Sequence, residues 1–216
     1  MAYGLTMEAG EGQNDFLRRV AETLAKNDLD SATAWMNQLA EGDGRNSFIS
    51  GLSGGLSQES PHIAAEFVAK LPAGEAQDKA ALAVISSWSA NDPLAAAAWV
   101  DRFPEGQLRE QASASLLSNW ARHDPEGSSQ WLAGLPEGKS RERAIQSYIN
   151  ALSWESPEFA AQWIQYLPEE NRRYSQSLNV ARNWARYDRD AATKWVESLV
   201  LSENHKKQVL KQVQNR

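Results

Sequence analysis

The sequence predicts an all-α protein, a right-handed α-solenoid built from antiparallel helix pairs. Three observations lead to this prediction. Landmark residues recur at a spacing of 32 with no insertion, each repeat carries two apolar stripes with helical periodicity, and prolines stand where helices begin and end. Self-similarity at one fixed spacing is typical of repeat arrays, in which each unit packs on its neighbours. We therefore expect six helix pairs followed by a C-terminal capping helix.

The repeat is clearest in the segment from Trp120 to Pro136, which reads WARHDPEGSSQWLAGLP. Its second tryptophan belongs to an aromatic column formed by Trp35, Phe67, Trp99, Trp131, Trp163 and Trp195. Its last leucine belongs to a column formed by Leu39, Leu71, Phe103, Leu135, Leu167 and Leu199. We expect the aromatic column to be the buried spine of the array.

This register divides the chain. Residues 1–12 are rich in glycine and polar residues and are expected to form a flexible tail. Within them Tyr3 and Met7 fall in the aromatic and leucine columns, as the remnant of a half-repeat or of a longer repeat protein. The six repeats are expected at 13–44, 45–76, 77–108, 109–140, 141–172 and 173–204. Residues 205–216 begin another first helix, and Gln208 and Gln212 give it the more polar face that a capping helix needs.

Each repeat contains two amphipathic helices. In the fourth repeat the first stripe consists of Ala112, Ser113, Leu116, Leu117 and Trp120, and the second of Ser128, Trp131, Leu132 and Leu135. Both stripes follow the 3.6-residue period of one helix face, and neither shows the alternation of a half-buried strand. The sequence therefore indicates two helices per repeat and no sheet.

Prolines and their neighbours mark the helix boundaries. An oxygen-bearing residue precedes a proline in Ser60-Pro61, Asp92-Pro93, Asp124-Pro125 and Ser156-Pro157. Such a residue can cap a helix N-terminus, and proline suits the first helical position because no intrahelical hydrogen bond needs its missing N–H. The prolines that end the second helices are Pro72, Pro104, Pro136 and Pro168. They do so because proline disfavours helical geometry in the residue before it.

The first helix of the second repeat departs from the pattern, because Gly51, Gly54 and Gly55 lie along one flank of it. Each glycine destabilises a helix by about 1 kcal/mol relative to alanine. Close approach of two helices explains the three glycines, and the alternative is a bare backbone left open for a ligand.

Composition narrows the function classes. The chain has 216 residues, a formal net charge of −6 and no cysteine, which excludes disulfides and thiolate metal sites. The acidic balance argues against general binding to a nucleic-acid backbone, which needs a basic surface. No signal peptide is visible, and no apolar run approaches the roughly 18 residues of a membrane span. We expect a soluble, cytoplasmic protein that does not bind membranes.

A pair of helices with a bulky aromatic residue in the second helix and a proline after it resembles the tetratricopeptide and pentatricopeptide class of α-solenoids. The likeness covers residues 13–216 and is one of architecture, because the spacing is 32 and the Gly-Tyr pattern of the first helix is missing. The resemblance implies a superhelix whose concave groove, lined by first helices, binds a protein or peptide. The pentatricopeptide likeness implies RNA as a further alternative, against which the acidic charge argues.

Catalytic motifs are missing from the sequence. His62, His123 and His205 occupy different columns without the spacing of metal ligands, and they are expected to be surface residues. The chain has no phosphate-binding loop, no dinucleotide glycine motif and no nucleophile elbow. We therefore expect a non-enzymatic scaffold without cofactor or metal, and the competing interpretation is a structural module that associates with itself.

One charged column needs an explanation, since a cation near a helix N-terminus opposes the helix dipole. The column contains Arg45, Arg109, Arg141 and Arg173, each of which opens a first helix. These arginines can bond the C-terminal carbonyls of the preceding second helix or the turn residues Glu105, Glu137 and Glu169. The alternative is a ladder that binds an anionic partner.

A candidate partner surface lies on the first helix of repeat five. With about 100° per residue, the face opposite the apolar stripe carries Arg143, Gln146, Asn150 and Trp154. The residues that match Trp154 in the adjacent repeats are Arg122 and Arg186, and Arg182 lies one turn before the latter.

Exposed tryptophan and arginine are the residues enriched in interaction hot spots. The sequence therefore predicts a partner-binding site on this face. Two alternatives stay open at this point. Trp154 can stack on Arg186 as a local cation–π pair, worth about 0.5–1 kcal/mol, or it can turn inward at the helix end.

Overall fold

The structure is a computed structural model that describes residue 8 and residues 10–214. Over these residues the chain forms thirteen α-helices and no strand, which confirms the predicted all-α class. The positions of Tyr3 and Met7 lie outside the described residues.

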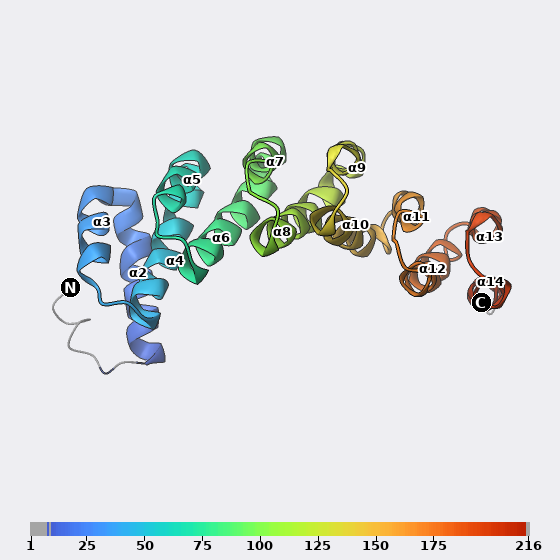
Figure 1. The fold of residues 1–216 in the computed structure, drawn as a ribbon, viewed down its shortest axis with the longest axis horizontal. Helices are drawn as coiled ribbons and strands as arrows, with labels where there is room; N and C mark the ends of the chain where they lie inside the picture. The colour runs from blue at the N-terminus through green and yellow to red at the C-terminus, as the bar shows by residue number, and fades with distance from the viewer. Residues whose placement is uncertain (1–7, 9, 215–216) are drawn as a thin grey trace. The chain divides into compact units, whose positions relative to one another are not determined.

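Long and short helices alternate along the chain (Figure 1). The long first helices are α2 (Glu11–Asn27), α4 (Asp43–Glu59), α6 (Glu75–Asn91), α8 (Gln107–His123), α10 (Lys139–Leu152) and α12 (Glu170–Trp184). The short second helices are α3 (Leu29–Gln38), α5 (Pro61–Ala69), α7 (Pro93–Val100), α9 (Pro125–Gly134), α11 (Pro157–Ile164) and α13 (Arg189–Ser198). The last helix is α14 (Glu203–Gln214).

The helices form two compact units, residues 1–96 and 97–216, and the boundary falls inside α7. In the N-terminal unit α2 packs along α4 and α4 along α6, while α3 and α5 form a second row. In the C-terminal unit α8 packs along α10 and α12 along α14, while α9, α11 and α13 lie on the other side of the chain (Figure 1). Each unit is therefore a two-layer stack of helix pairs.

Four aspartates cap second helices. The side chains of Asp28, Asp92, Asp124 and Asp188 accept the backbone N–H three residues on, at 2.8–3.0 Å. This bond satisfies one of the free donors at a helix start. Of the four residues predicted as caps, Asp92 and Asp124 make this bond, whereas Ser60 and Ser156 occupy the N-cap position without a side-chain cap bond. Asp28 and Asp188, which precede no proline, cap their helices in the same way.

A glycine column sets where first helices begin, and the sequence reasoning overlooked it. The N-cap residues of α2, α4, α6, α8 and α10 are Gly10, Gly42, Gly74, Gly106 and Gly138, all with φ between 139° and 157°. With their extended ψ near 180°, these are conformations that essentially only glycine adopts. In the sequence this column is visible as five glycines at a spacing of 32. The next position of this column is occupied by Glu170 instead of glycine, and Glu170 is the first residue of α12.

The aromatic column is not the buried spine that we predicted. Phe67 and Trp163 are buried, but Trp131 and the other members remain partly exposed. The column that is buried in every repeat lies one residue further on, at Met36, Val68, Val100, Leu132, Ile164 and Val196. A helix buries the residues on its inner face, and the aromatic column lies beside that face at the margin of the core.

The two buried glycines of α4 lie against α2. A Cβ atom added to Gly51 would lie 2.1 Å from the Arg18 carbonyl oxygen, and one added to Gly55 would lie 2.7 Å from the Ala25 Cβ. Both distances are too short for any side chain, so close helix packing accounts for these two positions. Gly54 has nothing within 4 Å of its Cβ direction.

None of the helices in the described part of the chain is long and apolar enough to cross a membrane.

Candidate functional site

The candidate surface lies within the C-terminal unit, on one face of three first helices. We call it the arginine face. It consists of Gln111, Ala114, Ser118 and Arg122 of α8, Arg143, Gln146, Asn150 and Trp154 from α10 and its C-terminal turn, and Ser175, Leu178, Arg182 and Arg186 from α12 and the turn after it. The three sets are related by the 32-residue spacing and follow one helical stripe. The face carries four arginines, one tryptophan and no carboxylate.

Trp154 and Arg186 meet at one end of the arginine face. Trp154 follows the end of α10 and is 52% exposed. The guanidinium carbon of Arg186 lies 4.5 Å from the centre of its ring. The local cation–π pair considered from the sequence is therefore present, and Trp154 does not turn inward. The pair holds the ring in place while half of it stays accessible, because the cation covers only one part of the surface.

A groove opens beside the arginine face. It has a volume of about 540 Å³ and is lined by Glu110, Lys139, Glu142, Arg143, Gln146, Ser147, Asn150 and Arg172. These residues come from α8, α10 and the start of α12. Within the groove the Gln146 side-chain amide donates to Asn150 Oδ1 at 3.1 Å, and Arg172 pairs with Glu169 at 3.3 Å.

The structure brings some of the predicted site residues together and separates others. Arg143, Gln146 and Asn150 line the groove. Trp154 and Arg186 form the cation–π pair instead, and Arg182 donates to Asn179 Oδ1 at 2.9 Å. The sequence reasoning missed Glu110, Lys139, Glu142 and Arg172, all within the first turn of their helices. The register places Glu142 and its equivalent Glu110 directly before the Arg143 position, and this is the signal that could have found those two residues.

Two arginines of this face are unpaired. Within the described residues, Arg122 and Arg143 make no hydrogen bond or ion pair, and both are exposed. The corresponding face of the N-terminal unit differs, since Arg18 pairs there with Asp15 and Glu22, both at 3.2 Å. The side-chain hydrogen bond to Asp15, more than the charge of Glu22, raises the pKa of Arg18. Arg122 and Arg143 therefore keep free guanidinium donors on the C-terminal face, whereas Arg18 is paired on the N-terminal one.

The column of arginines at the starts of first helices has a structural role. Arg173 donates through Nη1 to the carbonyl oxygens of Leu167 and Pro168, at 2.7 and 2.9 Å. Gln77 occupies the same column and donates to the carbonyls of Val68 and Leu71. These bonds join the start of a first helix to carbonyl oxygens at or just after the end of the preceding second helix.

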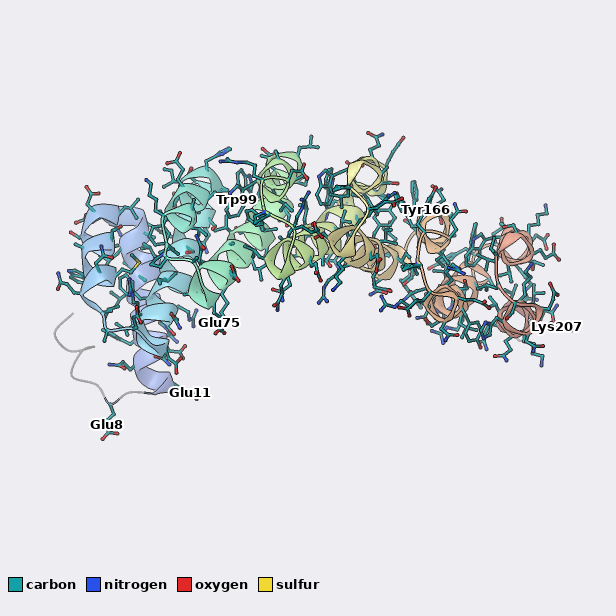
Figure 2. The ribbon with its side chains drawn as sticks, in the orientation of Figure 1. Glu8, Glu11, Glu75, Trp99, Tyr166 and Lys207 are labelled. Carbon is teal, nitrogen blue, oxygen red and sulfur yellow. The ribbon has the colours of Figure 1, made fainter. Side chains whose placement is uncertain are left out.

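The other arginines of this column face charges or rings of the turns. Arg45 approaches Glu41 at 4.0 Å, Arg109 approaches Glu105 at 3.8 Å, and Arg141 lies 6.0 Å from the centre of the Tyr166 ring. Tyr166 follows α11 and is largely exposed (Figure 2). Arg109 and Arg173 therefore make contacts that the first interpretation named, whereas Arg141 faces a tyrosine ring and Glu169 pairs with Arg172.

The histidines make local contacts. His62 meets the ring of Trp88 edge-on at 4.7 Å, and His123 Nδ1 lies 3.0 Å from the carbonyl oxygen of Asn119. His205 is not the free surface residue that we expected, because it contacts Glu170 at 2.8 Å and stacks on Tyr174. Among the described residues no group of three or more histidines and carboxylates could hold a metal ion.

Tyr148 illustrates how the polar groups of the core are satisfied. Its hydroxyl donates to the carbonyl oxygen of Pro125 at 2.9 Å, and burial raises its pKa to about 12. A phenol with this pKa stays protonated at neutral pH, so it serves as a structural donor.

Comparison with known proteins found no similar protein. No protein-family model matches the chain, and neither a curated protein nor a solved structure is significantly similar to it.

Proposed function

We propose that this chain is a non-enzymatic scaffold that binds a protein or peptide on its first-helix surface. In this proposal the six 32-residue helix pairs stack as a right-handed α-solenoid of the tetratricopeptide-like class, and α14 caps the array. The starts of α2, α4, α6, α8 and α10 support it, since they follow one another at a spacing of 32. A stack of equivalent helix pairs presents a continuous row of first helices, which repeat proteins use as a binding surface.

The arginine face with its adjoining groove is the observation that carries the proposal. A peptide in a helical array needs exposed side chains with large contact area and directed polar bonds. Trp154 supplies the area, and Arg122 and Arg143 supply unpaired donors. The amides of Gln146 and Asn150 lie between them on the same stripe.

Selection from a displayed library of random peptides tests the proposal, with the full chain as bait. Selected peptides should slow hydrogen exchange in α8, α10 and α12 and leave α9, α11 and α13 unchanged. The matched variants are Arg143→Glu on the arginine face and Lys194→Glu, an exposed residue of α13. Peptides that protect only the second helices, or that bind both variants equally well, would rule out the first-helix surface as the binding site.

Self-association is a second candidate function, and one observation favours it. An apolar hollow of about 390 Å³ on α2 and α3 is lined by Phe16, Arg19, Val20, Thr23, Leu24 and Trp35. The corresponding residues of α4, Phe48, Leu52 and Leu56, are buried. A second copy of the chain could cover this hollow. A mass from sedimentation equilibrium that does not change with concentration would exclude this function, and a rising mass that Phe16→Ser abolishes would support it.

A further inference from the structure

The charges of the chain are divided unequally between the two units. Residues 1–96 contain six basic and thirteen acidic residues, a net charge of −7, whereas residues 97–216 contain sixteen basic and fifteen acidic residues, a net charge of +1. The arginine face concentrates the positive charge of the second unit, because its twelve positions include four arginines and no carboxylate. Complementary potentials select partners at interfaces more than they add raw affinity.

We infer that the arginine face binds an extended acidic protein segment, whose carboxylates bond Arg122, Arg143 and Arg182 and whose apolar side chain packs on Trp154. This inference rests on the proposed function and specifies the partner. Arg122 and Arg143 are exposed and have no partner in the described chain. Arg182 uses one of its five guanidinium donors for Asn179. A guanidinium group holds a carboxylate by two parallel bonds, so free arginines favour carboxylates as ligands.

Trp154 defines where the apolar residue of the segment would lie. Arg186 stacks over its ring at 4.5 Å and so restricts the ring before a partner arrives. A restrained aromatic ring loses little conformational entropy on binding. Trp154 is the one large hydrophobic side chain of the arginine face that is exposed, since Leu178 packs against the core.

The spacing of the helices limits the spacing of the acidic residues. Packed helices lie about 8–10 Å apart, and an extended chain advances about 3.4 Å per residue. Helices α8 and α10 pack along each other, and Arg143 corresponds in the 32-residue register to Gln111, eleven positions before Arg122. The two arginines are therefore also offset by about 16 Å along the helix axes. Carboxylates that reach both are expected about five or six positions apart. An acidic run without gaps would place most of its charges away from the arginines.

The groove favours a peptide over a nucleic acid. Glu110 and Glu142 line it together with Lys139, Arg143 and Arg172. A phosphate backbone carries a charge at every nucleotide and needs a continuous basic surface. A peptide can place uncharged residues or its own N–H groups opposite the two glutamates. The mixed lining therefore fits a segment in which neutral residues separate the acidic ones.

The test uses a fluorescent synthetic peptide with glutamates six positions apart, glycine and serine between them and one central leucine. Fluorescence anisotropy with the full chain should show binding that weakens as salt is added, because exposed ion pairs are screened. Replacing the glutamates with glutamine should abolish it. Arg143→Glu and Trp154→Ala should each weaken binding by about tenfold, whereas Lys194→Glu should not. Arg143→Lys should retain part of the affinity, since lysine keeps the charge without the bidentate geometry.

The outcomes separate the inference from the proposed function. Equal binding of the glutamine peptide, or no effect of Arg143→Glu, overturns the acidic partner. If the random library then selects neutral peptides that slow hydrogen exchange in α8 and α10, the proposed function holds without an acidic partner. Binding of single-stranded RNA that exceeds binding of the peptide and is lost in Arg143→Glu assigns the face to nucleic acid. If the molar mass of the chain rises with concentration and Arg143→Glu abolishes this rise, the arginine face binds a second copy of the chain. Unchanged unfolding midpoints of the variants confirm that each comparison reports on binding.

Discussion

Glu170 Oε1 lies 2.8 Å from Nδ1 of His205, which joins the first turn of α12 to the first turn of α14. The same oxygen accepts the backbone N–H of Ser202 at 2.9 Å. The Ser202 backbone bond, followed by the His205 side chain, lowers the pKa of Glu170 from 4.5 to about 2. Glu170 thus occupies a position of the glycine column, and its carboxylate binds the start of α14 through Ser202 and His205.

This lowered pKa predicts a pH dependence of stability. A carboxyl group whose pKa is lower in the folded state stabilises the fold above its unfolded pKa and loses that effect as pH falls through its folded pKa. The contribution of Glu170 is therefore full above pH 4.5 and is lost towards pH 2. Glu170→Gln, which keeps an acceptor but removes the charge, should lower the free energy of unfolding at pH 6. Urea unfolding should show the gap to the wild type closing as pH falls below 4.5.

The control for this prediction is Glu197→Gln, which removes an exposed carboxylate of α13 that makes no hydrogen bond or ion pair within the described residues. Its stability should follow the wild type at each pH. If the difference between Glu170→Gln and the wild type stayed constant from pH 6 to pH 2.5, the bonds to Ser202 and His205 would not be the cause.

The glycine column yields a prediction about backbone strain. Gly106 has a φ of 156°, and no atom lies within 4 Å of the Cβ that an alanine would add. Gly106→Ala should therefore lower the free energy of unfolding by about 1–3 kcal/mol through backbone strain alone. The comparison is Gly134→Ala, because Gly134 is helical and equally open. That change should stabilise the protein by about 0.4–1 kcal/mol. Chemical denaturation measures the change in the free energy of unfolding for each variant. If both variants changed it in the same direction, the strain argument would be wrong.

The sequence predicts the elements of this fold better than their burial. A spacing of 32 and the Asp-Pro pairs were enough to predict pairs of helices and the caps at Asp92 and Asp124. The burial of Trp131 could not be predicted, since one residue separates its column from the fully buried Leu132. A shift of one residue turns a helical position by about 100°. Small errors in the assumed helix orientation therefore change which side chains are enclosed.

The candidate site was predicted only in part for a related reason. The arginines and Trp154 could be recognised by their spacing on one helix face. Arg172 could not, because its place beside Arg143 depends on how α12 approaches α10. The bond between Glu170 and His205 likewise joins residues 35 positions apart. Periodicity describes one helix at a time, whereas grooves arise between helices.

The corrected core leads to a prediction for two tryptophans. Trp163 is 6% exposed, and its Nε1 donates to Ser129 Oγ at 3.0 Å. Trp131 occupies the same column but is less buried, and its Nε1 bonds the exposed Asp101 at 3.3 Å. Trp163→Ala should lower the free energy of unfolding by about 3–5 kcal/mol, the usual effect of emptying a buried aromatic site. Trp131→Ala should have a smaller effect. If urea unfolding showed a larger loss of stability for Trp131→Ala than for Trp163→Ala, the corrected burial of the aromatic column would be wrong.

The glycines of α4 allow a matched test within one helix. A Cβ at Gly51 would lie 2.1 Å from the carbonyl oxygen of Arg18, whereas a Cβ at Gly54 meets nothing within 4 Å. Backbone cannot move aside as a flexible side chain can, so Gly51→Ala must separate α4 from α2. Overpacking of this kind usually destabilises by about 1–3 kcal/mol or more. Gly54→Ala should instead stabilise α4 by up to about 1 kcal/mol, because alanine is the better helix former. Thermal unfolding followed at 222 nm compares the two. A loss of stability in Gly54→Ala would contradict the open environment of this position.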